Sequence, residues 1–413
     1  MDFKAERVKG MEEFRKEVWE FYEKNIPKEM INSPGALDNR DITLEELRWA
    51  REFWRKLGDR GWLDPLAPPE YSNGHKFTLE QAIAIDETES DFRDVVGSWP
   101  SPADLGVSLG VPALMVYGTE EQKQRFLTDI LGGRVITWQL FTEPGAGTDL
   151  AGCTSTAVWS EEERVWIVNG SKQFGGGPFF PPDLMPHYGY GPFVTEPNAP
   201  RHRNLTAFLI PMNLPGATPN RLDMLSGGWR DLTFFENVRV PDIYRIGERG
   251  QGWLVINATL EREHGGGGSA LRRSPYRDAL FALIKERGWL RDDPEGQEEL
   301  MDYFLIGEVS RLFNQRNYWM RTSHQRWAWE GSQNAEWSKA NRAPQEDRLL
   351  DIIGPHVLLD YKDPDTLLRG RVESAQRAVH AVHAGGTIEA QKIIMGRRIG
   401  IGQHVPTQAQ VVA

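Results

Sequence analysis

The sequence predicts an α+β protein that is mainly α and has three parts. We expect an N-terminal helical domain (residues 1–132), a central β domain (133–248) and a C-terminal helical bundle (249–413). A change in the spacing of apolar residues predicts this division. The spacing is close to 3.6 residues in the first part, two in the second and 3.6 again in the third. These are the periods of amphipathic helices and of half-buried strands.

In the first part, helical spacing begins at Met11 and continues through Val18 and Tyr22. Thr43 precedes Glu46 by three positions, and this spacing is typical of a capping box, in which each side chain bonds the other residue's backbone N–H. We therefore expect a helix to start after Thr43 and to end near Gly58. A further helix is expected from Thr78 onward.

Runs rich in β-branched and aromatic residues at 165–168, 205–211 and 232–240 predict strands in the second part. Asn169-Gly170 stands between two such runs, and this dipeptide is typical of a two-residue type I′ turn. We therefore expect a hairpin there. In the third part, residues 300–326 and 372–383 are long amphipathic segments that predict bundle helices.

Composition excludes several classes of function. The net charge of −11 disfavours nucleic-acid and anionic-membrane partners, because those surfaces attract basic proteins. No apolar run approaches the ~20 residues that a membrane-spanning helix needs, and residues 1–6 lack the apolar core of a signal peptide. The single cysteine, Cys153, excludes an intrachain disulfide framework and is expected to be a packing residue. We expect a soluble, cytoplasmic protein.

A ligand-binding loop is predicted at residues 141–150, directly after the apolar run 135–140. Pro144, Gly145 and Gly147 break regular structure, so several backbone N–H groups can face a ligand. Thr142 and Thr148 add hydroxyls that suit the carbonyl and ring-nitrogen positions of a planar heterocycle. The loop offers no general base.

Residues 140–149, Leu-Phe-Thr-Glu-Pro-Gly-Ala-Gly-Thr-Asp, resemble the flavin-binding signature of the acyl-CoA dehydrogenase family. Five further segments are similar to the family in the same order along the chain: 117–127, 168–172, 235–241, 246–252 and 385–389. The resemblance implies a central β-barrel-like domain and a C-terminal four-helix bundle that mediates oligomerisation. It also implies FAD as cofactor and an electron-transfer flavoprotein, or a similar acceptor, as partner.

The implied reaction is α,β-dehydrogenation of an acyl-CoA thioester, which needs a base for the α proton and a flavin for the β hydride. The family places its catalytic glutamate at one of two positions. At the first, this chain has Gly385. At the second it has Glu261, within Thr-Leu-Glu-Arg, and the resemblance therefore implies Glu261 as the base. The alternatives are an ordinary exposed helix carboxylate and, as a lesser candidate, Glu263.

The resemblance also implies further site residues. Arg262 either stabilises the site or is an ordinary surface arginine, and Thr148, Arg262 and Gly385 are expected beside the substrate. The expected flavin contacts are Gln139, Phe141, Thr142, Gly147, Thr148, Phe174, Gly176, Arg287, Thr387 and Glu389.

The sequence departs from the family at two places. Phe174 is followed by Gly175-Gly176-Gly177, where relatives have Trp and then Ser or Thr, so a hydroxyl contact to the flavin is lost. The segments that clasp the adenine dinucleotide of a neighbouring subunit are not intact, and Arg287 and residues 351–355 fall near their places. Similar replacements occur in branches that act on bulky, steroid-like or branched acyl groups.

Two glycine runs, 265–268 and 175–177, predict room for a branched or ring-bearing acyl group. The alternative for the first run is a flexible connection between two helices. His380 and His383 have helical spacing but no third ligand nearby in sequence, so we expect no metal site.

Two other functions remain open from the sequence. The same fold can serve another flavin reaction, monooxygenation or desulfination. The chain can also be the cofactor-poor structural subunit of a heteromeric acyl-CoA dehydrogenase. The expected assembly is a homo-oligomer or hetero-oligomer, either a dimer or a tetramer.

Overall fold

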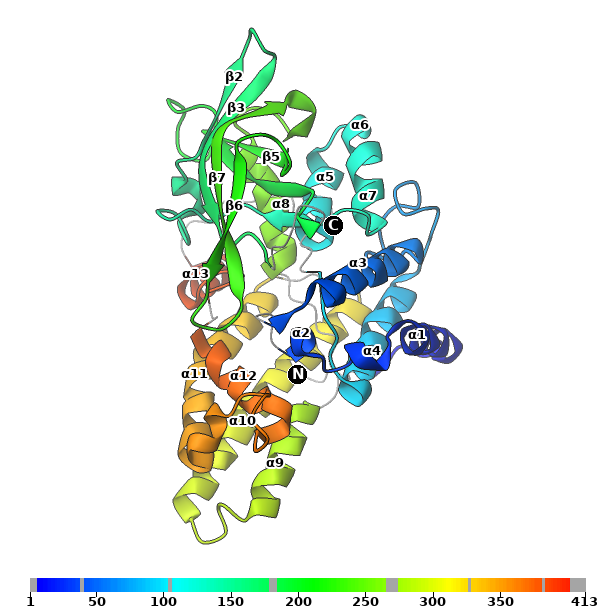
Figure 1. The fold of residues 1–413 in the computed structure, drawn as a ribbon, viewed down its shortest axis with the longest axis vertical. Helices are drawn as coiled ribbons and strands as arrows, with labels where there is room; N and C mark the ends of the chain where they lie inside the picture. The colour runs from blue at the N-terminus through cyan, green and yellow to red at the C-terminus, as the bar shows by residue number, and fades with distance from the viewer. Residues whose placement is uncertain are drawn as a thin grey trace.

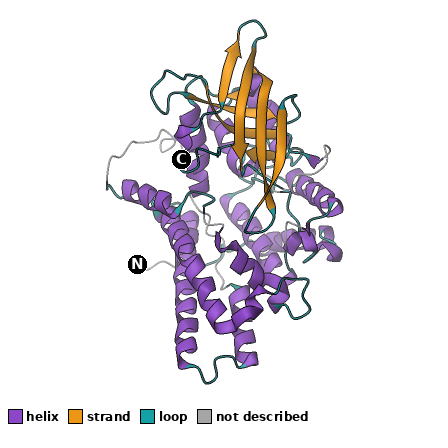
Figure 2. Cartoon of the chain, turned by 60° about the vertical axis from the view of Figure 1, so that its left-hand side comes forward, coloured by secondary structure: helices purple, strands orange, loops and turns teal. Residues whose placement is uncertain are grey.

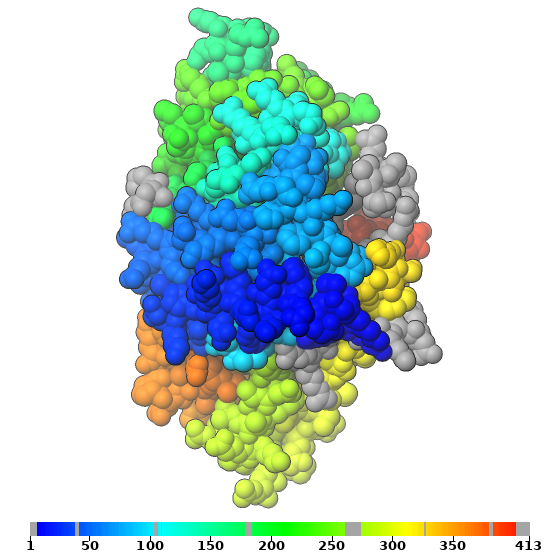
Figure 3. All heavy atoms as spheres, turned by 90° about the vertical axis from the view of Figure 1, so that its right-hand side faces the viewer, coloured from blue at the N-terminus to red at the C-terminus, as the bar shows by residue number. Residues whose placement is uncertain are grey.

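The structure is a computed structural model that describes residues 6–37, 41–102, 106–177, 184–264, 274–325, 328–380 and 383–401. A sheet forms one end of the molecule and a helical bundle the other (Figure 1). Figure 2 shows the strands gathered at the sheet end, with helices around and below them. The N-terminal helices cover one face between the two ends (Figure 3). The predicted α+β architecture, mainly α, is confirmed.

The N-terminal part consists of short and medium helices. α3 starts after Thr43, whose hydroxyl accepts from the Glu46 N–H at 3.2 Å, while the Glu46 carboxylate accepts from the Thr43 N–H at 2.7 Å. The predicted capping box is confirmed, and Thr78 forms a second one with Gln81. The helices are α1 (Glu12–Asn25), α2 (Pro34–Leu37), α3 (Leu44–Asp59), α4 (Leu79–Val96), α5 (Val111–Tyr117), α6 (Glu120–Gln122) and α7 (Thr128–Leu131).

In the described part of the chain, eight strands form one mixed sheet. The strand order is β6-β7-β3-β2-β4-β5-β8, and β1 pairs in parallel with β4. β1 ends at Gln139, and the predicted ligand loop follows almost directly after it. The strands are β1 (Thr137–Gln139), β2 (Thr156–Ser160), β3 (Val165–Gln173), β4 (Tyr188–Val194), β5 (Leu205–Pro211), β6 (Ala217–Asp223), β7 (Trp229–Pro241) and β8 (Arg245–Ile246).

The predicted hairpin at Asn169-Gly170 is wrong. Both residues lie inside the continuous strand β3, which pairs with β7 on both sides of them. The register shifts between Val168 and Gly170, and Gly170 has a φ of 133°. The extra residue lies on the 13-residue strand β7, where Glu236 and Asn237 stand opposite Asn169, so the dipeptide stays within β3 and faces a β-bulge of its partner strand.

The C-terminal part begins with α8, which packs on the sheet, and continues into the bundle. Leu280, Ile284, Leu349 and Ile353 form part of the bundle core. The first domain boundary, 132/133, precedes β1, and the second, 248/249, precedes α8; both stay predictions. The helices are α8 (Gly252–His264), α9 (Pro275–Arg287), α10 (Pro294–Thr322), α11 (Glu330–Ile353), α12 (Arg371–Arg377) and α13 (Ile388–Arg398).

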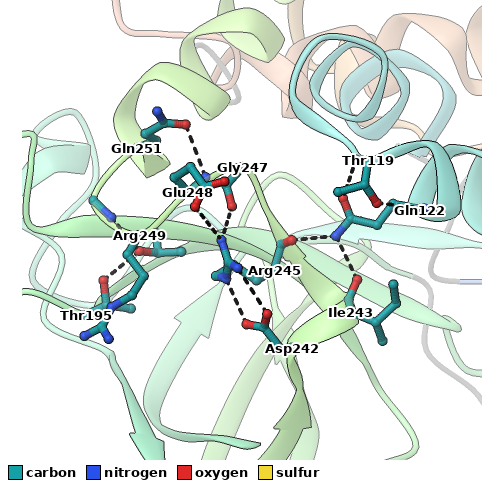
Figure 4. Close-up of polar contacts among 12 residues, drawn as sticks. Thr119, Gln122, Thr195, Asp242, Ile243, Arg245, Gly247, Glu248, Arg249 and Gln251 are labelled. Atoms are coloured by element: carbon teal, nitrogen blue, oxygen red, sulfur yellow. Dashed lines mark hydrogen bonds and ion pairs between the residues drawn. The ribbon is translucent and has the colours of Figure 1, made fainter.

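One of the segments that carry the resemblance, 117–127, has a structural role. Gln122, the last residue of α6, donates to the carbonyl oxygens of Ile243 at 2.9 Å and Arg245 at 2.6 Å (Figure 4). The Arg245 guanidinium in turn binds Asp242 at 2.8 Å. These contacts fasten the N-terminal helices to the end of the sheet, directly before the chain enters α8.

The N-terminal helices also contact the bundle through polar groups. Tyr318 on α10 donates to Glu87 on α4 at 2.7 Å, and Arg321 pairs with Asp86 at 2.7 Å. None of the helices in the described ranges is long and apolar enough to cross a membrane.

Candidate active site

After β1 the chain makes one further backbone hydrogen bond to β4, and the predicted ligand loop then forms a tight turn that is closed by its own backbone hydrogen bonds. The Leu140 N–H donates to the Tyr190 carbonyl at 2.6 Å, and Glu143 and Ala146 exchange N–H···O bonds of 2.9 and 3.1 Å. The amides of Glu143 and Ala146 are therefore satisfied within the loop. Beyond them, Gly147 and Thr148 are exposed, and their amides have no hydrogen bond within the described residues.

A buried ion pair braces this loop against the end of β3. The Lys172 ammonium, 0% exposed, lies 2.8 Å from Glu143 Oε1. Glu143 also accepts from the Thr154 N–H at 2.7 Å and the Ser155 N–H at 3.1 Å. Burial by itself would raise the pKa of Glu143, but the Lys172 charge and these hydrogen bonds outweigh it and lower that pKa.

Sequence reasoning missed this brace. Glu143 and Lys172 both stand inside segments that carry the resemblance, and a charged residue within an otherwise strand-like run was the available signal. The partners are 29 residues apart, so no local pattern could have joined them.

The end of β3 lies beside the loop. The Gln173 N–H donates to the Thr142 carbonyl and the Gln139 N–H donates to the Gly175 carbonyl, both at 2.8 Å. Phe174 follows with a φ of 61° and a side chain that is 43% exposed. A left-handed backbone at a large apolar residue costs roughly 1–3 kcal/mol and is typical of functional sites. The structure thus brings Gln139, Thr142 and Phe174 together.

The three glycines after Phe174 do not widen a cavity, and that expectation is wrong. A Cβ at Gly176 would overlap the Trp138 indole, and one at Gly175 would stand 2.5 Å from the Gln139 carbonyl oxygen. The Gly176 N–H donates to the buried Asp231 carboxylate at 2.7 Å. These positions need glycine because neighbouring groups pack directly against the backbone.

Contacts between side chains connect the loop with α8. The rings of Phe141 and Tyr190 have centroids 5.6 Å apart. The Tyr190 hydroxyl lies 3.3 Å from Thr259 Oγ1, and both residues are buried. Glu261 and Arg262 follow Thr259 in the last turn of α8. The side chains of residues 261–264, and the whole of the glycine run 265–268, lie outside the described part of the structure.

The other predicted base position is a turn before α13. Gly385 has a φ of 66°, and its carbonyl accepts from Gln391 Nε2 at 2.6 Å. Lys339 on α11 donates to the carbonyls of Ala384 at 2.6 Å, Gly385 at 3.3 Å and Gly386. The turn is therefore tied to the bundle through its backbone, and Gly385 provides no side chain for proton transfer.

Thr387 and Glu389 follow this turn at the start of α13. The Thr387 hydroxyl accepts from the Ala390 N–H at 3.2 Å, so it caps the helix. Glu389 is exposed, and hydrogen bonds from its own N–H and from Thr387 lower its pKa. Arg287 is not brought to the loop. It is exposed at the end of α9, which lies at the opposite end of the molecule from the sheet (Figure 1).

Comparisons with known proteins identify relatives of the chain. Residues 10–134 match the family model "Acyl-CoA dehydrogenase, N-terminal domain". The acyl-CoA dehydrogenase FadE26 of Mycobacterium tuberculosis is 29% identical over 375 residues, which cover 84% of this chain and 86% of FadE26. The chain is a relative of the acyl-CoA dehydrogenases. The proteins it resembles are flavoprotein oxidoreductases, and the chain is an oxidoreductase.

Solved acyl-CoA dehydrogenase structures share the whole fold. The ChsE4–ChsE5 complex of Mycobacterium tuberculosis has a TM-score of 0.74 and 25% identity, with 97% of this chain and 100% of that chain covered. A structure described as "Tcur3481-Tcur3483 steroid ACAD" has a TM-score of 0.78 and 24% identity, and covers 97% of this chain and 99% of its own.

The loop fits the flavin of the acyl-CoA dehydrogenases. Gly145 and Gly147 have no heavy atom within 4 Å of the place where a Cβ would stand, so the chain leaves space there. The amides of Gly147 and Thr148, which have no partner among the described residues, are available as donors for ring or phosphate oxygens. Phe174 offers an exposed aromatic face. Among the described residues, no group of three or more His, Cys, Asp or Glu side chains could hold a metal ion.

Proposed function

We propose that this chain catalyses FAD-dependent α,β-dehydrogenation of an acyl-CoA thioester. Thr142 and the amides of Gly147 and Thr148 would hold the polar ring edge and phosphate of FAD, and Phe174 would pack against the ring. Bound FAD supplies a hydride acceptor, which no amino-acid side chain provides. Thr387 and Glu389 approach from α13, and their reach to the flavin is part of the proposal.

Glu261 removes the α proton of the thioester. A carboxylate is basic enough for this step when it is placed over the acidified carbon and shielded from water. At the other position where the family places its catalytic glutamate this chain has Gly385, so Glu261 would be the single base of the reaction. Arg262 follows Glu261 on α8, and its positive charge would stabilise the site electrostatically.

The observation that carries this proposal is the connection between the loop and α8. Phe141 contacts Tyr190, and Tyr190 is bonded to Thr259, two positions before Glu261. This connection fixes the helix of the proposed base relative to the loop that would hold the flavin. Catalysis depends on such fixed placement, because small errors in geometry cost large factors in rate.

The test is the visible spectrum of the purified protein and its response to acyl-CoA. We expect yellow protein that releases FAD on denaturation and bleaches when mixed anaerobically with substrate. Glu261→Gln should still bind FAD and thioester but reduce the flavin ~10²–10⁴-fold more slowly. Glu263→Gln is the matched control and should keep the wild-type rate.

Two results would contradict the assignment. Protein that takes up no FAD on titration, with or without acyl-CoA, would exclude the dehydrogenase function for the chain alone. Normal flavin reduction in Glu261→Gln, with loss in Glu263→Gln, would move the base to Glu263.

The proposed assembly is an oligomer in which Arg287 of one subunit contacts the FAD of another. Its exposed position at the far end of α9 supports a role across an interface rather than within one chain. The partner is a second copy or a different acyl-CoA dehydrogenase chain, and an electron-transfer flavoprotein accepts the electrons. Light scattering of the protein purified alone, and FAD content with and without a co-expressed partner, distinguish the two assemblies.

A further inference from the structure

One residue of β7, Asp231, holds the segment 174–177 that follows β3. The two strands pair side by side up to this point (Figure 1). The Asp231 carbonyl accepts from the Phe174 N–H at 2.9 Å. The carboxylate of the same residue accepts from the Gly176 N–H at 2.7 Å. The backbone and the side chain of Asp231 therefore bind the chain at Phe174 and again two residues beyond it.

The segment is also fixed from the side of β1. The Gly175 carbonyl accepts from the Gln139 N–H at 2.8 Å, and the Trp138 indole fills the place where a side chain at Gly176 would stand. Phe174 has a φ of 61°, in a region that large apolar residues rarely adopt. Such a conformation persists only where the surrounding contacts hold it. Asp231 provides two of these contacts.

Asp231 is an unusual residue for its position in the sheet. It is 0% exposed and has no ion pair within the described ranges. Its second carboxylate oxygen accepts from the Thr233 hydroxyl at 2.9 Å. Burial raises the pKa of Asp231, although the hydrogen bonds from Thr233 and Gly176 act in the opposite direction. Because burying a carboxylate without a cation is unfavourable, stability of the sheet alone does not explain an aspartate here.

The Phe174 ring is the feature that this arrangement orients. Its side chain is 43% exposed, and the preceding residue, Gln173, donates from its N–H to the Thr142 carbonyl at 2.8 Å. The ring therefore stands beside the loop that would hold the flavin. Two aromatic systems interact favourably only in particular arrangements, offset stacked or edge to face. A fixed backbone at Phe174 limits the ring to few positions.

We propose that Asp231 is a positioning residue, whose carboxylate holds the Phe174 ring in place against the flavin. The inference rests on the proposed dehydrogenase function. Asp231 touches neither substrate nor flavin and acts through Phe174. Because the contacts that fix the ring all lie within the chain, the cofactor meets a wall that is already arranged, and no binding energy is used to order it.

The first test measures the segment itself, in the apoprotein. Asp231→Val removes the acceptor for the Gly176 N–H but keeps a side chain that suits a strand. Hydrogen exchange in peptides that cover residues 171–177 should become about 10-fold faster or more, because local opening follows the loss of such bonds. Asp231→Ser, whose side chain is too short to reach Gly176, serves if the valine variant does not fold.

Asp231→Asn is the conservative variant and should restore the wild-type behaviour. Its amide oxygen can accept from the Gly176 N–H while its NH₂ group donates to the Thr233 hydroxyl. Exchange at residues 171–177 should therefore stay close to that of the wild type. If exchange is as fast in Asp231→Asn as in Asp231→Val, the hydrogen bond to Gly176 is not what holds the segment.

The second test measures the bound flavin. Visible circular dichroism of FAD depends on the groups around its ring, so Asp231→Val should change the spectrum and Asp231→Asn should not. The kcat for flavin reduction by acyl-CoA should fall about 10- to 100-fold in Asp231→Val, because misplacement of reacting groups is costly in rate. The KM for the thioester should change little, since the variant leaves the thioester contacts in place.

A double variant shows whether Asp231 acts through Phe174. Phe174→Leu removes the aromatic ring. In that background Asp231→Val should change kcat by less than about threefold, because two substitutions that remove the same contact do not add. Tyr318→Phe is the control for a general loss of stability. It breaks a buried hydrogen bond to the Glu87 carboxylate between α10 and α4, and it should leave the flavin spectrum and the exchange at 171–177 unchanged.

The results separate this inference from the function on which it rests. Wild-type exchange and a wild-type flavin spectrum in Asp231→Val overturn the positioning role and leave the dehydrogenase proposal standing. Additive effects of Asp231→Val and Phe174→Leu overturn the role as well. If the flavin spectrum responds as expected but no acyl-CoA reduces the flavin, the dehydrogenase proposal falls and the contact between Phe174 and the flavin stands. Wild-type protein that takes up no FAD overturns both.

Discussion

Glu143 and Glu346 are both buried carboxylates, and their surroundings differ. Glu143 lies beside the Lys172 ammonium and accepts backbone hydrogen bonds, which lower its pKa. Glu346 has an oxygen without a partner among the described residues, and burial raises its pKa to about 7. The first group is paired and stabilises a loop, whereas the second is left without an ion pair of its own. The comparison teaches that pairing, more than burial, decides the direction in which the pKa of a buried carboxyl moves.

The largest effect is expected from breaking the structural pair. Lys172→Met leaves Glu143 buried beside a neutral side chain, and removal of one partner from a buried ion pair typically costs about 3–5 kcal/mol. Urea denaturation should show this loss, and the flavin should be released at a lower urea concentration.

The double variant Lys172→Met with Glu143→Gln is the control. It removes both charges and should recover much of the lost free energy of unfolding. A Lys172→Met protein with wild-type stability would contradict the structural role of the pair.

A second prediction concerns the pH dependence of stability. The folded pKa of Glu346 is raised above its ordinary value of 4.5 to about 7, so its stabilising proton is fully bound below pH ~4.5 and is lost as pH rises through 7. Glu346→Gln keeps a neutral side chain at all pH values. The variant should therefore gain stability relative to wild type between pH 5 and pH 8, by up to roughly 3 kcal/mol. The charged and titratable groups that face Glu346 are Tyr276, Arg277, Tyr303, Arg342 and Asp347.

For Glu143→Gln we expect the opposite dependence of stability on pH. Because the folded pKa of Glu143 is lowered, its contribution is present above its ordinary pKa and is lost as pH falls. The destabilisation caused by Glu143→Gln should thus shrink toward acid pH. Parallel pH profiles for the two variants would show that the two carboxylates do not differ as described.

The smallest expected effect comes from removing either of two buried tyrosine hydroxyls. Tyr190 is bonded to Thr259 at 3.3 Å, whereas the Tyr276 hydroxyl has no partner among the described residues. Tyr190→Phe should cost about 1 kcal/mol and slow flavin reduction, because it leaves the Thr259 hydroxyl without that bond. Tyr276→Phe should be neutral or slightly stabilising. Denaturation midpoints of the two variants check this, and equal losses would contradict it.

Local patterns determined much of the architecture. Thr43 and Glu46 predicted a helix start because a capping box involves only residues three positions apart. The change of apolar spacing predicted the order of helical, β and helical parts, since side-chain direction repeats with the local backbone. The ligand loop and Glu261 came from a resemblance carried by contiguous residues, and the roles of both stay proposals.

Tertiary structure decided the features that depend on distant partners. Asn169-Gly170 has the local signature of a turn, but pairing with β7 places it inside a strand, opposite a bulge of β7. Gly176 was expected to leave space, and the approach of Trp138 fills it. The Glu143–Lys172 pair and the unpaired Glu346 in the bundle also arise only when separate elements meet. Short-range geometry is encoded by neighbours in the chain, whereas burial and pairing depend on what the folded chain places beside each group.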